Sequence, residues 1–309
     1  MLYQRRHVID DSLRALLASK PNVEVRWSSR VKRLGNGPAV ELANGSVLTA
    51  DFVVDASGRH SKLCADYTSS CSETVIDLQY VSLEFDVAND DDDDARFGIA
   101  VFPKAGQPRG AAVMRLQGNR VLATVFGYQE GRPRNVNTAD DFIAFARTAP
   151  QDDVATFLRN ATAVGKPHTF VYDKMTQRSF KYMPDHCIAI GDAACSTDPC
   201  FAQGMSKAAV QALYVKRAFD NKGTCRQSDF EHVADVPYFL GSVEAYRHLP
   251  STVVPRVIKP VLGAFDMAFY AASRDAVVYD ELMRVLHMRK HIGWLVLQLP
   301  RIVYRCVMG

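Results

Sequence analysis

The amino-acid sequence predicts a mixed α/β (α+β) fold with an inserted antiparallel sheet and a helical region at its C-terminal end. Two short apolar strands, at 51–55 and 187–190, each run into a Gly turn, which is typical of buried strands in a parallel sheet. Polar and apolar residues alternate from about Val75 to Gln129, and this predicts an antiparallel sheet of about four strands in a second domain. The pattern over 228–308 is largely helical.

The first predicted element is an amphipathic helix over residues 6–19, because apolar residues recur there at helical spacing. Four short β segments separated by turn residues follow, as in a small β-meander. They are Val23–Trp27, Arg30–Leu34, Ala39–Leu42 and Ser46–Leu48. The next strand, Asp51–Asp55, leads into the turn Ala56, Ser57, Gly58.

The middle of the chain divides into an alternating block and a helical block. Strands are predicted at 75–87, 97–103, 108–117 and 119–128, and helices near 138–148 and 151–163. The pattern returns to strand at Thr169–Tyr172 and Cys187–Ile190, and a long helix is predicted over about 203–220. Prolines such as Pro237, Pro260 and Pro300 punctuate the helical region that follows.

Composition excludes several classes of protein. The formal net charge is +3, and no Lys/Arg cluster alternates with aromatics, so no nucleic-acid partner is predicted. The acidic run Asp90–Asp94 lacks the spaced ligands and central Gly of a calcium loop and is interpreted as a solvated loop. No pattern indicates an oligomeric state.

The lack of a targeting signal in the sequence and its cysteine pattern predict a cytoplasmic location. The N-terminal residues have no apolar signal region, and no stretch approaches the roughly 20 apolar residues of a spanning helix. Residues 292–299 are interpreted as a helix stopped by Pro300 and packed on the domain, with weak membrane contact as the lesser alternative. The seven cysteines are odd in number and form no CxxC pair, which predicts neither a disulfide framework nor a zinc site.

The segment beginning at Cys187 carries the strongest chemical signal. An apolar strand ends at Gly191, Asp192 stands at its carboxyl end, and a loop with Pro199 leads to a helix that begins near Gln203, Gly204 and Met205. Ligands of α/β sheets bind at the carboxyl ends of strands, and a helix N-terminus offers N–H groups to an anion. A plain βα turn with an N-capping Asp remains the alternative from the residues alone.

The pattern GDAAxxxxPxxxQGM in this segment resembles the "GD" motif of flavoprotein hydroxylases of the p-hydroxybenzoate hydroxylase type. The resemblance implies that Asp192 hydrogen-bonds the ribityl chain of FAD. It also implies that Gln203, Gly204 and Met205 lie against the pyrimidine edge of the isoalloxazine, where a helix N-terminus stabilises the negative charge of reduced flavin. Gly191 and Pro199 belong to the same implied cofactor site.

Upstream residues agree with this resemblance. Residues 51–61 are similar to the strand and turn ADLVVDASGRxS, which implies that Ala56, Ser57 and Gly58 close over the ADP portion of FAD. The helix led by Arg6 resembles one whose Arg faces the flavin side, and the backbone around Val31 would lie near adenine. The resemblance extends from Arg6 to about Leu286 and is strongest to uncharacterised bacterial FAD-dependent oxidoreductases.

The Gly-rich GxGxxG turn that begins this family does not occur before Arg6. The nearest match, Gly35-Asn-Gly37, lies between two short β segments and is interpreted as a hairpin turn. The sequence is therefore expected to be an N-terminally truncated member with a partial FAD-binding Rossmann-like domain. The expected domains are 1–66 (FAD-binding, first part), 67–167 (substrate), 168–220 (FAD-binding, second part) and 221–309 (helical).

The implied activity is that of an FAD-dependent monooxygenase or related oxidoreductase, with NAD(P)H as reductant and a flavin C4a-hydroperoxide as the oxidant. No catalytic acid or base is assigned. The implied substrate is a hydrophobic small molecule, either aromatic, polyketide-like or isoprenoid, bound between the flavin and the antiparallel sheet. Candidate lining residues are Phe97, Phe102, Met114, Phe126 and Tyr128.

Several alternatives stay open. In the first, the chain is a truncated or degenerate member that binds no FAD and is either inactive or a binding module. In the second, it is a geranylgeranyl-reductase-like flavoenzyme. A halogenase is disfavoured because no WxWxIP stretch occurs, and GxSxG, P-loop and HExxH motifs are also absent. The pair His287 and His291 is more simply a surface coincidence than a metal site, and Cys195 and Cys200 are more simply loop-filling residues than flavin contacts.

Overall fold

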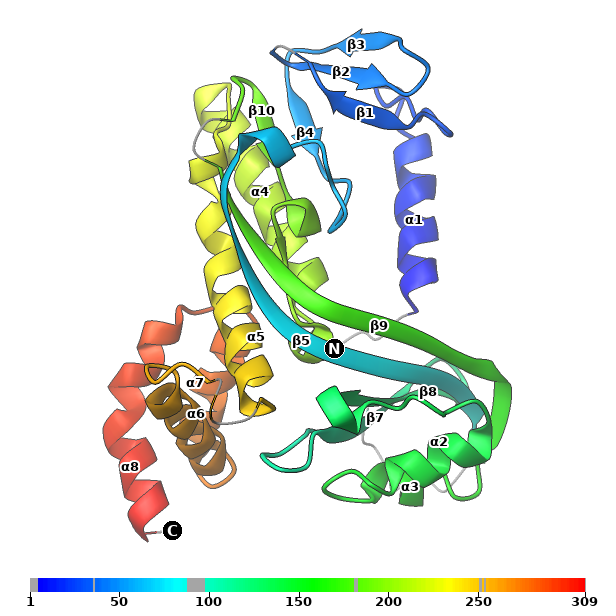
Figure 1. The fold of residues 1–309 in the computed structure, drawn as a ribbon, viewed down its shortest axis with the longest axis vertical. Coiled ribbons are helices and arrows are strands. Elements are labelled where there is room, and N and C mark those ends of the chain that lie inside the picture. Colours follow the sequence, from blue (N-terminus) through cyan, green and yellow to red (C-terminus); the bar gives the residue numbers. More distant parts are fainter. Residues whose placement is uncertain are drawn as a thin grey trace. The chain divides into compact units, whose positions relative to one another are not determined.

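The structure is a computed structural model that describes residues 5–35, 37–87, 98–180, 183–249, 252 and 254–308. The chain divides into two compact units, unit 1 (Met1–Ser28 and Asp77–Asp173) and unit 2 (Ser29–Ile76 and Lys174–Gly309). Two long strands, β5 (Thr68–Asp86) and β9 (Thr162–Phe180), run through both units (Figure 1). The acidic run Asp90–Asp94 and Phe97 lie outside the described residues.

Unit 1 contains the antiparallel sheet that the alternation predicts. Strands β6 (Gly98–Val101), β7 (Arg109–Arg115) and β8 (Arg120–Tyr128) lie side by side, and β8 pairs with β5 in the register Ser82↔Thr124. These predicted strands are confirmed, although β5 begins at Thr68 rather than near Val75. Alternate residues of β8, such as Val121, Ala123 and Val125, are fully buried, so one face of the sheet forms a core.

Two helices cover that buried face of the sheet (Figure 1). Helix α2 (Ala139–Ala146) begins at a capping box in which Thr138 and Asp141 satisfy each other's backbone N–H groups. Phe142 is fully buried and packs 5.6 Å from Phe85 between ring centroids. Helix α3 is confined to Asp153–Phe157, so the prediction of a helix over 151–163 is wrong in length, because β9 already begins at Thr162 and pairs with β5.

Helix α1 (Arg6–Ala18) is confirmed, but its apolar side is not buried. No residue of α1 is buried, and Leu13, Leu16 and Leu17 are each about half exposed. Just before α1, the guanidinium of Arg5 donates to both carboxylate oxygens of Glu84 at 2.7 Å. The helical spacing therefore predicted the helix correctly, but its apolar stripe does not pack into a core formed by the described residues.

Unit 2 begins with a β-meander. Strands β1 (Val31–Leu34), β2 (Ala39–Leu42) and β3 (Val47–Thr49) pair antiparallel, which confirms three of the four short β segments and the hairpin at Gly35–Gly37. The fourth, Val23–Trp27, is wrong: these residues form no strand, and Trp27 is 67% exposed. An alternating pattern becomes a strand only where a neighbouring strand supplies hydrogen bonds, and no described strand pairs with this segment.

A parallel pair of strands forms the centre of unit 2. Strand β4 (Val53–Asp55) pairs with β10 (Cys187–Ala189) in the register Val53↔Cys187, which confirms the parallel arrangement. Strand β10 is completely buried, whereas Val54 of β4 is 43% exposed, so the expected burial holds only for β10. Helix α4 (Gly204–Lys222) packs against this pair through a cluster that includes Ile188 and Ala218.

The far edge of β10 is closed by a side chain instead of another strand. The amide of Gln227 accepts from the N–H of Ala189 at 2.9 Å and donates to its carbonyl at 3.0 Å. Gln227 therefore supplies the two hydrogen bonds that a neighbouring strand would supply, and it leaves no open backbone group at that position.

The remainder of unit 2 is helical, as predicted. A short strand, β11 (Cys195–Ser196), pairs with β9. The helices are α5 (Asp235–Arg247), α6 (Lys259–Ala272), α7 (Ala276–Leu286) and α8 (Leu299–Met308). The prediction that Pro300 stops a helix is wrong: Pro300 lies in the first turn of α8, where its missing N–H costs nothing. Across the described residues no helix combines the length and apolarity needed to cross a bilayer.

Candidate functional site

Two turns meet at one end of the parallel strand pair in unit 2. Ala56, Ser57 and Gly58 follow β4, and Gly191 and Asp192 follow β10. The N–H of Ile190 donates to the carbonyl of Asp55 at 2.9 Å, so the two chain segments stay together beyond the last strand residues. Because both strands are parallel, their carboxyl ends lie at the same edge, where α/β sheets bind ligands. The structure thus brings these five predicted residues together.

The two turns have conformations that suit close approach by a ligand. Gly58 and Gly191 have φ angles of +88° and +61°, which only Gly adopts without strain. A Cβ placed on Gly58 would meet no atom within 4 Å, so the space in front of this backbone is open. The side chain of Asp55 is buried and accepts from the N–H and Oγ of Ser57 and from Oγ of Ser61, which fixes the first turn.

Arg178 joins the two turns to each other. From β9 its guanidinium donates to the carbonyl of Ala193 in the second turn and to the carbonyls of Arg59 and Ser61, at 3.3 and 3.4 Å, beside the first. Three carbonyls on one planar group restrict the separation of the two turns. Sequence analysis did not identify this residue, because a lone Arg in a strand gives no sign of its partners.

A stripe of buried polar side chains on α4 and the residue preceding it holds the second turn. Gln203, Lys207 and Gln211 are four residues apart, and each is at least nine-tenths buried. Gln203 donates to the carbonyl of Leu286 at 2.7 Å, and Gln211 accepts from the N–H of Gly191 at 2.8 Å. The spacing of three long polar residues was the signal in the sequence that could have found this stripe.

Lys207 is the charged member of this stripe. Its side chain is completely buried, and its Nζ lies 3.3 Å from Oδ1 of Asp192, whose own side chain is 44% exposed. The same ammonium donates to the carbonyl of Cys195. A buried ammonium needs such partners, and here they orient the Asp192 carboxylate while part of it remains open to a ligand.

The beginning of α4 is also open. The Gln203 side chain points to Leu286 and makes no cap hydrogen bond, so the N-cap residue leaves the first-turn N–H groups of α4 without its side chain as acceptor. A Cβ on Gly204 would meet nothing within 4 Å, and Met205 is 60% exposed. Pro199 is exposed in the preceding turn Pro199–Phe201. This arrangement suits a flat or anionic group placed on the helix N-terminus.

A cavity of about 740 Å³ lies over the first turn. Val31 and Ser57, two predicted cofactor residues, both line it. Four of its other lining residues are basic in character, namely Arg30, Lys32, His60 and Lys62. Cationic side chains of this kind bind phosphate groups, so the lining fits an anionic nucleotide.

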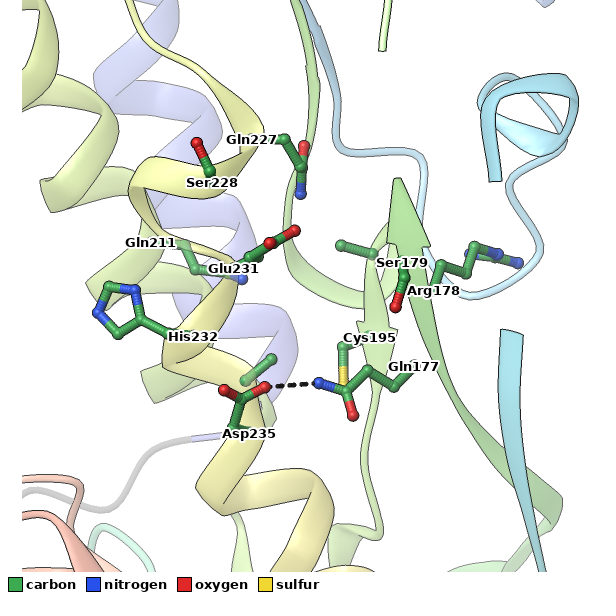
Figure 2. Close-up of a pocket in the computed structure, with 12 residues that line it drawn as sticks. Gln177, Arg178, Ser179, Cys195, Gln211, Gln227, Ser228, Glu231, His232 and Asp235 are labelled. Atoms are coloured by element: carbon green, nitrogen blue, oxygen red, sulfur yellow. Dashed lines mark hydrogen bonds between the residues drawn. The ribbon is translucent and has the colours of Figure 1, made fainter. Parts of the chain in front are cut away.

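A second, smaller cavity of about 230 Å³ lies behind the second turn, and none of the predicted cofactor residues line it (Figure 2). Gln177 donates to Asp235 at 2.8 Å on one wall, while Arg178 extends away from the cavity (Figure 2). Cys195 lines its inner side, and burial raises the pKa of this thiol to about 12. A protonated thiol at this depth fills space and is not a nucleophile.

The residues present fit the parts of FAD that the motif implies. The open backbone at Gly58 and Gly204, the oriented Asp192 carboxylate and the basic cavity match a diphosphate, a polyol chain and an anionic ring edge. Arg6 belongs to unit 1, where its side chain is 84% exposed and its Nε lies 3.8 Å from a carboxylate oxygen of Asp10. Within the described residues, no three His, Cys, Asp or Glu gather as a metal site.

The candidate substrate residues lie in unit 1. Met114 and Phe126 are half-buried and belong to the face of the sheet opposite α2 and α3, since their neighbours Val113 and Val125 are buried in the core. Phe102 is 50% exposed, and Tyr128 is completely buried. The structure therefore decides which face of the sheet packs against α2 and α3, a point that alternation alone left unresolved.

Comparison with solved structures identifies the fold. The structure of the flavin-dependent brominase Bmp2 aligns with 98% of this chain, and the alignment covers 74% of the Bmp2 chain, with a TM-score of 0.66 and 18% sequence identity. A flavoprotein/dehydrogenase from Cytophaga hutchinsonii matches 99% and 73% with a TM-score of 0.67 and 16% identity. The probable FAD-dependent monooxygenase PqsL of Pseudomonas aeruginosa matches 83% and 72% with a TM-score of 0.55 and 17% identity.

The chain has the fold of flavin-dependent monooxygenases. Among curated proteins, Protein Rv3254 of Mycobacterium tuberculosis (strain ATCC 25618 / H37Rv) is 25% identical over 294 residues, which cover 87% of this chain. The match spans 60% of the length of Rv3254. No family model matches the chain.

Proposed function

We infer that this chain forms the FAD site of an FAD-dependent monooxygenase or related oxidoreductase. The observation that carries the inference is the meeting of the turns after β4 and β10, with Asp192 oriented by Lys207 beside an uncapped helix N-terminus. Asp192 would accept hydrogen bonds from the ribityl hydroxyls, and α4 would stabilise negative charge on the pyrimidine edge. Val31 and Ser57 would line the site of the ADP portion.

FAD binding by the purified chain tests this inference. A titration followed by flavin absorbance and fluorescence should show saturable binding. Asp192→Ala should weaken it by about 1.5–3 kcal/mol, the usual value of hydrogen bonds to a charged group, or roughly 10- to 100-fold in Kd. Lys207→Met should weaken binding in the same direction, because the Asp192 carboxylate would lose its orienting partner.

Glu231→Gln, in the smaller cavity, is the matched control and should leave the Kd unchanged. A chain with native circular dichroism that binds no FAD would contradict the inference and favour the binding-module alternative. Equal affinity for wild type and Asp192→Ala would show that the cofactor lies elsewhere.

The reductant and the substrate are finer parts of the same proposal. The resemblance supports NAD(P)H as reductant and a hydrophobic aromatic, polyketide-like or isoprenoid substrate. The half-buried Met114 and Phe126, on the face of the sheet opposite α2 and α3, provide apolar surface of the kind such a substrate needs. When bound, FAD supplies the electron transfer and oxygen activation that the side chains lack. Substrate-stimulated NAD(P)H oxidation tests this, and oxygen uptake distinguishes it from the alkene reduction of a geranylgeranyl-reductase-like enzyme.

The expected location is part of this proposal too. No disulfide joins the cysteines in the part of the chain that the structure describes, and several of them are buried. Free thiols persist in the reducing cytosol, which supports the cytoplasmic location expected from the sequence.

A further inference from the structure

The last residues of the chain pack on unit 2 with one apolar side. This C-terminal segment, residues 289–308, contains a 3₁₀ turn at Ile292–Gln298 and helix α8. Ile302 is 3% exposed and packs with Ala268 of α6 and Leu282 of α7. Leu295 and Cys306 pack against the same cluster. The inner side of the C-terminal segment therefore already provides the contacts that attach it to the protein.

A second apolar side of the C-terminal segment remains exposed. Leu299, Val303 and Val307 are four residues apart and form a continuous row on α8. Val307 is 73% exposed, and Trp294 in the preceding turn is 49% exposed. The full set of exposed large apolar residues is Trp294, Val296, Leu297, Leu299, Val303, Tyr304, Val307 and Met308. A contiguous apolar surface of this kind marks an interaction site, unlike a single exposed Leu.

The charges carried by this segment itself are all positive. No Asp or Glu follows Glu281, whereas the cations after it are Arg284, Arg289, Lys290, Arg301 and Arg305. Four of these five cations pair with three acidic residues of α7 and its N-cap, Asp275, Asp280 and Glu281, which leaves a formal excess of two positive charges. Arg289 is exposed and has no ion pair with any residue that the structure describes.

Cations and aromatic rings lie together at the border of the exposed side. The Lys290 ammonium lies 4.7 Å from the centroid of the Trp294 ring, and the Arg305 guanidinium lies 5.8 Å from that of Tyr304. Trp and Tyr prefer the level of lipid headgroups, and long cationic side chains can reach anionic headgroups while their stems stay apolar. An exposed apolar row with an aromatic and basic border is the pattern of a helix that lies in a membrane surface.

We propose that the C-terminal segment docks on the surface of an anionic lipid bilayer, with Trp294, Val303 and Val307 inserted at the level of the headgroups. A second copy of this chain fits less well, because two basic borders would repel each other. The exposed stripe of α1 differs, since the charges of Arg6, Asp10, Asp11 and Arg14 at its border cancel. The proposal does not depend on FAD binding.

The test uses Trp294 as a fluorescent reporter. In the full-length chain with Trp27→Phe, Trp294 is the only remaining tryptophan. Its emission should shift to shorter wavelength on addition of phosphatidylglycerol/phosphatidylcholine vesicles, and the protein should sediment with them. Binding should weaken when ionic strength rises from about 0.1 M to about 1 M, because the charges are screened. Vesicles of phosphatidylcholine alone should bind much less.

Two variants examine the two sources of binding separately. Val307→Asp should weaken vesicle binding about tenfold or more, since it places a charge in the apolar row. Arg289→Gln should weaken binding about fivefold on anionic vesicles and leave binding to neutral vesicles unchanged. The matched control is Leu213→Asp on α4, which is 53% exposed and should bind like wild type. Circular dichroism establishes that each variant is folded.

Three results would overturn the proposal: no binding to anionic vesicles, equal binding to neutral ones, or full binding by folded Val307→Asp. Concentration-dependent dimerisation abolished by Val307→Asp, without any vesicle binding, would also overturn it and identify a second copy as the occupant.

Discussion

Individual residues of the second turn carry both its shape and its charge. Lys207 reaches Asp192 and the Cys195 carbonyl from inside the protein, and Gln211 holds the N–H of Gly191. One position has a conformational cost. Ala202, just before Gln203, has φ +53° and ψ +28°, the left-handed region in which a Cβ costs roughly 1–2 kcal/mol. The turn that leads into α4 is therefore held against a local preference.

Substituting Ala202→Gly should raise the free energy of unfolding by about 0.5–1 kcal/mol, because relief of the steric cost exceeds the added freedom of the unfolded chain. Urea denaturation measures it. Ala209→Gly, at an exposed site inside α4, is the matched control and should lower the same quantity by about 1 kcal/mol. A loss of stability in both variants would show that Ala202 is not strained.

At the scale of elements, one long side chain replaces a missing strand neighbour. The parallel pair β4 and β10 is short, and a two-stranded sheet has little stability on its own. Gln227 satisfies the backbone of Ala189 at one edge, and Arg178 ties the following turns together. The site depends on these contacts between elements more than on the strands themselves.

Gln227→Leu should destabilise unit 2 by about 1–3 kcal/mol, because it leaves the buried N–H and carbonyl of Ala189 without partners. Hydrogen exchange of the Ala189 amide should accelerate markedly, while amides in the unit 1 sheet keep their protection. The neighbouring exposed residue gives the control, since Ser228→Ala should change neither quantity. Unchanged protection at Ala189 would show that the Gln227 contact is dispensable.

For the whole molecule, carboxylates paired inside each unit connect stability to pH. In unit 1, the hydrogen bond from Arg5 lowers the pKa of Glu84 more than burial raises it. In unit 2, burial would raise the pKa of Glu244, but the hydrogen bond from His248 and the charge of Arg247 hold it below its usual value. Acid is therefore expected to weaken both units, each through its own carboxylate.

A lowered carboxyl pKa gives stability that is present above the unfolded-state pKa of about 4.3 and is lost as pH falls through the folded-state pKa. Glu244→Gln should therefore lower the free energy of unfolding at neutral pH by about 1–3 kcal/mol. The difference from wild type should shrink as pH falls below about 4. Denaturation curves across pH measure it, with exposed Glu231→Gln as control. A difference that stays constant down to acidic pH would contradict the role of the Glu244 charge.

The sequence by itself determined the elements that depend on local pattern. The helix at Arg6–Ala18, the meander, the alternating strands and the strand-turn-helix around Gly191 and Asp192 follow from periodicity and turn residues. Tertiary structure decided what depends on neighbours. No described strand pairs with Val23–Trp27, so this segment is not a strand. Helix α3 is shorter than predicted, because β9 begins at Thr162. Parallel pairing of β4 with β10 brought together two turns that are more than a hundred residues apart in the sequence. The role of Lys207 also depends on tertiary structure, because only its burial in the fold places its ammonium beside Asp192.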